Sequence, residues 1–229
     1  MAYSINSKDY FNTTLWTGDG NSTQNITGTG FNADWIWLKG RSGAGDHQLY
    51  DKVRGVQKMI ISNGTNAEST NSIGLQTFGS DGFTMGSDMT GNGSTFVSWN
   101  WLANGAGSSN TEGDITATVS ANTTSGFSII KFTSAGSVSQ TYGHGLNGTP
   151  KLWIIKDTSQ SSNNWQVYYN GTDRLKLDTT EATSTTAAYL MSANATTITT
   201  PSNSDSAWGN GNGVNYITYA FQEIKGFSK

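Results

Sequence analysis

The chain has 229 residues, of which 34% are hydrophobic and 13% charged, with a formal net charge of −3 and no cysteine. The weakly acidic balance excludes the basic stripe with which nucleic-acid-binding domains contact phosphates. The absence of cysteine excludes disulfide frameworks and thiolate metal sites. No apolar run approaches the ~20 residues that a membrane-spanning helix needs, so we expect no membrane insertion.

The rest of the composition is typical of a β protein. Aromatic residues make up 11% of the chain, and 28 glycines accompany only two prolines. Disordered chains have few aromatic residues, so this chain is one that can bury a core. β-branched, aromatic and turn-forming residues together indicate short strands joined by tight turns.

Two apolar segments in the first half predict buried strands. Residues 31–42 read FNADWIWLKGRS, and we expect Trp35 and Trp37 to fill a core. Residues 96–102 read FVSWNWL and carry apolar side chains on both faces. Such runs are typical of strands buried on two sides.

The segment 48–61 between them has two interpretations. Leu49, Val53 and Val56 follow a helical spacing, which would make one short helix. The alternative is two short strands with a turn at the Arg-Gly pair, and both alternatives stay open. Turns with less ambiguity are predicted at 80–83 (SDGF) and at the two GNG sequences, 91–93 and 211–213, each typical of a hairpin.

The second half repeats this arrangement after a change in composition. Residues 104–114 (NGAGSSNTEGD) are typical of a flexible linker. Strands are predicted at 126–132 and 216–221, and in the segment 148–159 we expect Leu152 and Ile154 to fill a second core.

Motifs of the two halves also correspond in order. The correspondences pair Gly20 with Gly136, Lys39 with Lys156, Gln48 with Gln166, Tyr50 with Tyr168, Gly91 with Gly211 and Trp101 with Phe221. Self-similarity at a nearly constant spacing indicates duplicated structural units. We therefore predict an all-β fold of two tandem duplicated antiparallel β-sandwich domains, jelly-roll or lectin-like, at residues 1–103 and 115–229, joined by the 104–114 linker.

Catalytic chemistry finds little support in the sequence. The two histidines, His47 and His144, do not correspond between the halves, and no nucleophile elbow or phosphate-binding loop is present. The acid pairs Asp46/Asp51 and Asp81/Asp88 do not recur in the second half. Aspartates are also common in surface turns for backbone reasons. We predict that the protein is not an enzyme and uses no metal or cofactor.

Carbohydrate binding remains a second hypothesis. Trp165 and Trp208 have polar and glycine neighbours, so we expect them to be the most exposed tryptophans. Exposed aromatic rings serve as ligand or interface contacts. We also include the neighbouring residues Asp46 and His47, in a predicted loop of the first half, as candidate contacts.

Several motifs together carry a resemblance to a known family. The stretches that carry it are YFNTTLWTGDGNSTQNITGTGFNADWIWLKGRS, HQLYDKVRG, SDGFT, FVSWNW, YGHGLNGTPKLWIIKDTSQSSNNWQVYY and YITYAFQEIKGFSK. They resemble a domain that recurs in virion structural proteins, often tail fibres or other surface appendages, of tailed phages of marine bacteria and cyanobacteria. The resemblance covers nearly the whole chain but supplies no catalytic or ligand residues. The sequence departs from the pattern in YAFQE, where a cysteine is expected after the tyrosine.

The resemblance implies a non-enzymatic virion component on the particle surface, either a capsid decoration or a tail or fibre part. Its partners would be other virion proteins and copies of itself. The start of the chain lacks the features of a secretory signal, so we expect synthesis in the host cytoplasm and release by lysis. The alternative is a lectin-like module that recognises host surface glycans.

Overall fold

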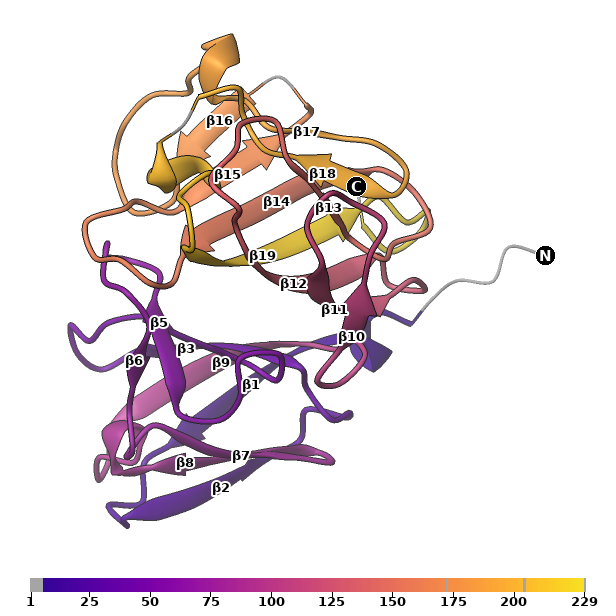
Figure 1. The fold of residues 1–229 in the computed structure, drawn as a ribbon. Coiled ribbons are helices and arrows are strands. Elements are labelled where there is room, and N and C mark those ends of the chain that lie inside the picture. Colours follow the sequence, from indigo (N-terminus) through magenta and orange to yellow (C-terminus); the bar gives the residue numbers. More distant parts are fainter. Residues whose placement is uncertain (1–5, 172, 204, 229) are drawn as a thin grey trace. The chain divides into compact units, whose positions relative to one another are not determined.

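A computed structural model describes residues 6–171, 173–203 and 205–228, and this part of the chain is all-β (Figure 1). Among these residues there are strands and short 3-10 segments but no α-helix. Consequently, none of the described segments forms an apolar helix of membrane-spanning length. The all-β prediction is confirmed.

The chain divides into two compact units. The first contains the residues up to Ser62 together with Glu68–Ala106, and the second contains Asn63–Ala67 and Gly107–Lys229. The second division falls inside the predicted linker, residues 104–114. However, Ser108–Asn110 form strand β10, which pairs with the next strand. This part of the predicted linker therefore belongs to the second unit.

The first unit consists of two antiparallel sheets. Its main sheet has the order β1-β9-β3-β4-β5-β6, made of β1 (Phe11–Thr17), β9 (Thr95–Trp101), β3 (Trp35–Gly40), β4 (Gln48–Asp51), β5 (Lys58–Ile61) and β6 (Ser69–Thr70). Its small sheet has the order β2-β8-β7, made of β2 (Thr23–Thr27), β8 (Gly82–Gly86) and β7 (Leu75–Gly79). Short 3-10 segments η1 (Ser7–Asp9) and η2 (Ser87–Met89) precede β1 and β9.

The core of the first unit is formed by side chains of both sheets. Ile36 and Leu38 of β3 pack there with Phe83 and Met85 of β8. Trp35 is buried as predicted, but it lies on the opposite face of β3 and is not part of this cluster, and Trp37 is only partly buried, because successive side chains of a strand point to opposite faces. The sequence WIWL is apolar on both faces, so its alternation could not identify the face that joins the core.

The segment 48–61 takes the strand alternative. It forms β4, a turn and β5, and the Gly55 N–H donates to Asp51 O at 2.9 Å within the turn. Gly55 has a φ of 100°, a conformation that favours glycine. The predicted hairpin at 80–83 is also confirmed, because it connects the paired strands β7 and β8.

The second unit also consists of two antiparallel sheets. Its main sheet has the order β10-β11-β12-β19-β14-β15-β16, made of β10, β11 (Ala117–Asn122), β12 (Phe127–Thr133), β19 (Asn215–Gln222), β14 (Pro150–Asp157), β15 (Gln166–Tyr169) and β16 (Asp173–Lys176). Its small sheet has the order β13-β18-β17, made of β13 (Thr141–Gly143), β18 (Thr197–Thr199) and β17 (Ser192–Ala193). The 3-10 segments η3 (Ala187–Tyr189) and η4 (Ser206–Trp208) lie in the connections.

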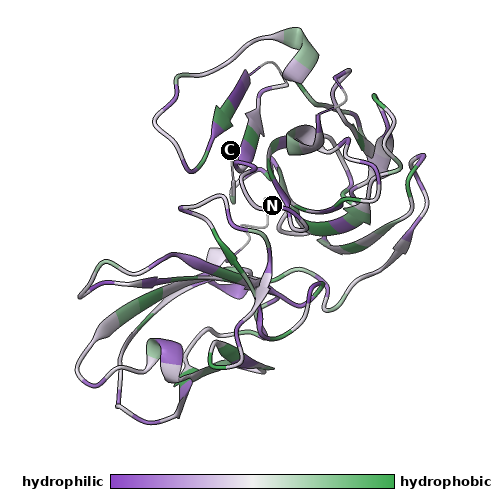
Figure 2. Cartoon of the chain, turned by 60° about the vertical axis from the view of Figure 1, so that its left-hand side comes forward, coloured by the Kyte–Doolittle hydropathy of each residue, from purple (hydrophilic) through white to green (hydrophobic). Residues whose placement is uncertain are grey.

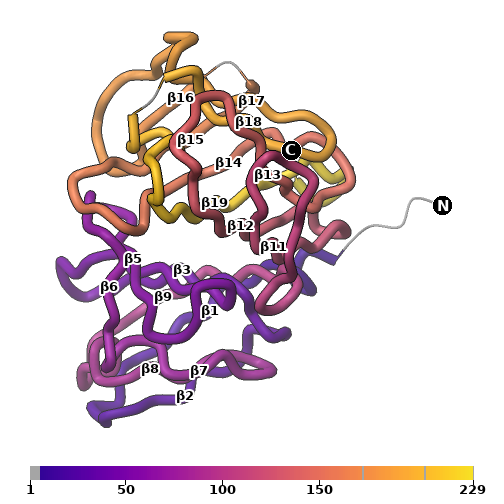
Figure 3. Tube along the Cα trace, in the orientation of Figure 1, coloured from indigo at the N-terminus to yellow at the C-terminus, as the bar shows by residue number. Residues whose placement is uncertain are grey.

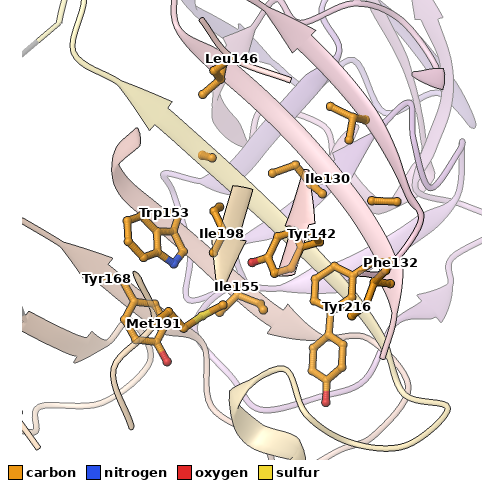
Figure 4. Packing of buried hydrophobic residues seen from close by; sticks show 14 of the residues in the cluster. Ile130, Phe132, Tyr142, Leu146, Trp153, Ile155, Tyr168, Met191, Ile198 and Tyr216 are labelled. Atoms are coloured by element: carbon orange, nitrogen blue, oxygen red, sulfur yellow. The ribbon is translucent and has the colours of Figure 1, made fainter. Parts of the chain in front are cut away.

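The core of the second unit contains Trp153 and Ile155 of β14 (Figure 4). Tyr168 stacks on Trp153 with the ring centroids 5.6 Å apart, and Ile198 of the small sheet packs in the same cluster. The predicted core residues Leu152 and Ile154 lie on the other face of β14 and outside this cluster; Ile154 is buried there as predicted, whereas Leu152 is only partly buried. Figure 2 shows the hydrophobic positions concentrated in the strands.

The two units have the same strand plan. β9 lies between β1 and β3, and β19 lies between β12 and β14 (Figure 3). The pairing register also agrees: Trp101 is opposite both Phe11 and Trp35, and Phe221 is opposite both Phe127 and Leu152. Duplication of an ancestral unit remains our interpretation, and this agreement supports it.

The two GNG sequences form equivalent turns, although they are not hairpins. Each turn precedes β9 or β19 of its main sheet and follows a 3-10 segment, so it does not connect two paired strands. Gly93 and Gly213 have φ values of 72° and 70°. The turns therefore use asparagine and glycine as predicted, but the hairpin prediction is wrong.

Candidate functional site

A pocket of about 190 Å³ lies at the ends of three strands of the second unit, β14, β15 and β19. All of its lining residues belong to this unit. They are Lys151, Leu152, Tyr169, Asn170, Phe221, Gln222, Glu223 and Ser228. We call it the Phe221 pocket.

The floor of the Phe221 pocket is one row of residues across the sheet. Leu152 of β14 is opposite Phe221 on one side and Tyr169 on the other. Phe221 in turn contacts the ring of Phe127, with the centroids 5.0 Å apart. Both aromatic rings that line the pocket are only partly buried, so each has apolar surface that a ligand could cover.

A β-bulge forms one wall of the Phe221 pocket. The register between β14 and β19 shifts between Pro150 and Leu152, which leaves Lys151 as an extra residue. Bulges bend a strand and redirect its side chains, and they are common beside binding sites. Asn170, another lining residue, lies beside the bulge: it has a φ of 54°, and its N–H donates to Lys151 O at 3.1 Å.

The side-chain amide of Gln222 supplies a polar group to the Phe221 pocket. Its Oε1 is buried and accepts no hydrogen bond from the described residues. A Cβ on Gly148 would lie 2.6 Å from Gln222 Nε2, so a glycine at this position leaves room for the amide. A buried acceptor without a donor is costly, and a ligand could reach this oxygen only after a rotation of the side chain, because almost none of its surface is exposed.

The equivalent row of the first unit has Trp35 and Trp101 in place of Leu152 and Phe221, and Asp51 in place of Tyr169. Trp35 occupies the position of Leu152, and its ring contacts that of Trp101 at a tilt of 31° with the centroids 4.2 Å apart. Leucine at this position in the second unit leaves the space above Phe221 open. The pocket thus coincides with several differences within a shared strand plan: smaller side chains at Leu152 and Phe221, an aromatic ring at Tyr169 and the bulge at Lys151.

Trp208 does not have the exposed ring that the sequence led us to expect. It is buried, and the guanidinium of Arg174 lies over its ring at 4.1 Å from the centroid. Tyr189 stacks on it with the centroids 5.1 Å apart. Burial lowers the pKa of the Arg174 guanidinium. Trp208 therefore holds a buried cation, and its ring is not available to a ligand.

Trp165 is also buried, contrary to prediction. Its side chain has no exposed surface, and its ring stacks on Tyr219 with the centroids 6.5 Å apart. Its backbone N–H donates to Asp178 Oδ1 at 3.2 Å. The polar neighbours in the sequence belong to loops beside Trp165, whereas its ring packs against the main sheet.

Asp46 and His47 lie at the start of β4 in the first unit, where Asp46 is exposed and His47 is half-buried. Lys39 Nζ lies 2.9 Å from His47 Nε2, which accepts its hydrogen bond when the imidazole is neutral. Partial burial and the charge of Lys39 lower the pKa of His47. These two residues belong to the other unit, so they are not part of the Phe221 pocket.

The aspartates that could form catalytic pairs have structural hydrogen bonds. Asp51 is buried and pairs with Arg54, with Oδ2 2.5 Å from Nε. Asp81 Oδ1 accepts the Gly30 N–H at 2.6 Å, and Asp88 Oδ2 accepts from Gln48 Nε2 at 2.6 Å. Within the described ranges, no three His, Cys, Asp or Glu side chains gather at a site that could hold a metal ion.

A second cavity, of about 200 Å³, lies beside the small sheet of the first unit. It is lined by residues 25–27 and 79–84. Thr84 Oγ1 donates to Asn25 Oδ1 at 2.7 Å and accepts from Thr77 Oγ1 at 2.9 Å. These polar groups satisfy one another, and Phe83 is the one aromatic residue of the lining, buried in the core.

Sequence reasoning missed the Phe221 pocket, although one signal pointed toward it. The corresponding segments TGTGFNADWIW and YGHGLNGTPKLWI differ by an insertion just before Leu152. That insertion falls where β14 carries its bulge. The pocket lining comes from three separate parts of the chain, so no single motif contains it.

These observations define an all-β protein of two double-sheet units, one of which carries a small aromatic-lined pocket. A family model described as "Domain of unknown function (DUF7483)" matches residues 6–229, and the chain belongs to this family. No curated protein and no solved structure matches the chain.

Proposed function

We propose that the protein is a non-enzymatic virion structural component on the surface of a tailed phage, as a capsid decoration or as a tail or fibre part. It would assemble with other virion proteins and with copies of itself through the surfaces of its sheets. The resemblance of its ordered motifs to virion structural domains is the starting point of this proposal.

The observation that supports a non-enzymatic role is that the aspartate carboxylates form hydrogen bonds and ion pairs within the protein. Each acid pair considered for catalysis includes a carboxylate held in hydrogen bonds that stabilise the fold, such as the buried Asp51–Arg54 pair. A general acid or base must have a proton position open to substrate. These aspartates instead fix turns and buried cations.

Quantitative mass spectrometry of purified particles tests the proposal. We expect the chain at a fixed number of copies per particle, retained through density-gradient purification and high-salt washes. A chain that is present in the lysate but absent from washed particles would contradict a structural role.

The Phe221 pocket favours a second candidate function, that of a lectin-like module for host surface glycans. Its aromatic rings can pack against the apolar face of a sugar ring. A pocket of about 190 Å³ is of a size that suits one sugar unit rather than a chain.

A substitution that fills the Phe221 pocket with a larger side chain tests this candidate function and creates no cavity in the core. Leu152→Trp places in the second unit the residue that the first unit has at the equivalent position. On a glycan array, we expect the wild type to bind selected glycans and the variant to lose at least about tenfold in affinity, or ~1.4 kcal/mol. Val138→Lys, at an exposed position outside the pocket, is the control. No glycan binding by the wild type, or equal binding by Leu152→Trp, would refute the candidate.

A further inference from the structure

The outer edge of the main sheet is treated differently in the two units. In the second unit, β12 pairs with β19 on one side and with β11 on the other, and β11 in turn pairs with β10. In the first unit, the equivalent strand β1 is the last strand of the sheet. A seven-residue strand is thus internal in one unit and an edge in the other.

The hydrogen bonds at the two ends of β1 show which of its backbone groups point outward. The Leu102 N–H donates to Tyr10 O at 2.9 Å, and the Gly18 N–H donates to Ser94 O at 2.8 Å. In an antiparallel ladder, alternate residues bond to the same neighbour. Even-numbered residues of β1 therefore bond to β9, and residues 11, 13, 15 and 17 direct their N–H and C=O groups to the open side.

Side chains satisfy part of this edge, but its centre is open. Asn12 Oδ1 accepts the Thr13 N–H at 3.0 Å, and Gln24 Nε2 donates to Thr17 O at 2.9 Å. Leu15 lies between them with 60% of its surface exposed. No described residue bonds to its outward backbone groups. The strand FNTTLWT contains no proline, lysine or other charged residue, which are the usual protections of an edge.

We infer that β1 pairs with β1 of a second copy of this chain, antiparallel and about a two-fold axis at Thr14. In this register Thr13 faces Leu15 of the second copy, and Phe11 faces Thr17. All four outward-pointing residues then occupy hydrogen-bonded pairs. Among the described residues, the hydrogen bonds to be released are those with the side chains of Asn12 and Gln24.

The composition of β1 favours a second copy as the occupant. A two-fold interface brings each residue near its own kind, so a charged strand would repel itself. β1 has no ionisable side chain, although the chain carries a net charge of −3. Leu15 also gains apolar cover from the methyl group of Thr13. This inference deepens the self-assembly in the proposed function and rests on it.

The first test is the oligomeric state of the purified chain by sedimentation velocity. We expect a concentration-dependent dimer for the wild type and a shift of at least tenfold in the dissociation constant for Leu15→Lys, which places a charge on each side of the two-fold axis. Val138→Lys changes a similarly exposed apolar residue, 45% exposed, in the second unit and should leave the dimer unchanged. A monomeric wild type, or a dimer insensitive to Leu15→Lys, overturns the inference.

Cross-linking then tests the register. The chain has no cysteine, so a single introduced cysteine can form a disulfide only between copies. Residue 14 would face itself in a non-hydrogen-bonded pair with the Cα atoms ~4.5 Å apart, which suits a disulfide. Two residues 17 would lie roughly 20 Å apart.

We expect Thr14→Cys to form disulfide dimers under mild oxidation and Thr17→Cys to remain monomeric on a non-reducing gel. Cross-linking of both variants or of neither contradicts the register. If the chain is found in particles but neither test succeeds, the pairing of β1 is wrong while the virion role stands. If both tests succeed but the chain is absent from particles, the virion role fails and the pairing stands.

Discussion

Both units bury an arginine, but they compensate its charge by different means. In the first unit, Arg54 Nε lies 2.5 Å from Asp51 Oδ2, and its Nη1 lies 3.3 Å from Glu68 Oε2. In the second unit, Arg174 has no carboxylate within ion-pair distance among the described residues. Its guanidinium lies over the ring of Trp208.

The difference shows that two units with the same strand order can compensate a buried charge in different ways. In a buried ion pair, the attraction between the two charges offsets the free-energy cost of their desolvation. If one partner is removed, the other remains buried with its desolvation cost uncompensated. A guanidinium over an indole ring is held by the ring quadrupole and leaves no opposite charge behind. The two arginines should therefore respond unequally to the same substitution.

Arg54→Met and Arg174→Met test this comparison and give the largest expected difference. Arg54→Met leaves the Asp51 carboxylate buried without its cation, and we expect the first unit to lose about 3–5 kcal/mol of stability. Arg174→Met retains a flexible apolar side chain against Trp208 but removes the donor of the buried Gln166 Oε1, which Arg174 Nη1 contacts at 2.9 Å, so we expect a smaller loss of about 1–3 kcal/mol in the second unit. Peptide-resolved hydrogen exchange in urea measures the two units separately. Equal losses would show that the aromatic ring and the carboxylate compensate the charge in the same way.

Two equivalent glycines provide a second, smaller comparison. Gly20 and Gly136 have φ values of 78° and 81°, and each faces the asparagine of its GNG turn. A Cβ on Gly136 would lie 2.5 Å from Asn212 Cβ, whereas one on Gly20 would lie 3.1 Å from Asn92 Cβ.

We expect Gly20→Ala to cost about 1–2 kcal/mol for its backbone conformation alone. Gly136→Ala should cost a further ~1–3 kcal/mol for the clash. Denaturant midpoints of the corresponding unit measure both values. A larger loss for Gly20→Ala would mean that the two turns differ in geometry.

The smallest expected effect concerns pH and a buried histidine of the second unit. His144 Nδ1 accepts the Leu146 N–H at 3.1 Å, so the imidazole is neutral and its Nε2 donates to Asn194 O at 3.2 Å. Burial lowers the pKa of His144 below its usual value of 6.5. As the pH falls, the unfolded chain therefore binds the proton before the folded chain does.

The contribution of His144 to stability is full above about pH 6.5 and is lost below it, with a slope of at most ~1.4 kcal/mol per pH unit. Thermal unfolding between pH 7.5 and 5 measures this slope, and His144→Gln should flatten it. His47 of the first unit is half-buried and also has a lowered pKa, so His47→Gln should flatten the profile less. An unchanged profile in His144→Gln would assign the slope to other groups.

Much of the fold could be predicted from the sequence because strands and turns are local. The strands at 96–102, 126–132 and 216–221 lie where the apolar runs placed them. The face that joins the core could not be predicted, since Trp35 and Ile36 are adjacent and both apolar. Their assignment depends on the small sheet, which is formed by residues distant in the sequence.

The candidate site depended still more on distant residues. Trp208 of η4 looked exposed beside glycine and asparagine, but Arg174 of β16, distant in the sequence, covers its ring. The Phe221 pocket depends on the absence of a large ring at Leu152, which only the comparison with Trp35 makes visible. Local composition carries no information about such contacts.

A cryo-electron-microscopy map of the purified particle, at a resolution that separates strands, would test the central claim most directly. We predict the chain on the particle surface, with β1 of each copy beside β1 of a neighbour, so that two six-stranded sheets join into one. Particles without the chain, or copies in which β1 faces solvent throughout, would contradict it.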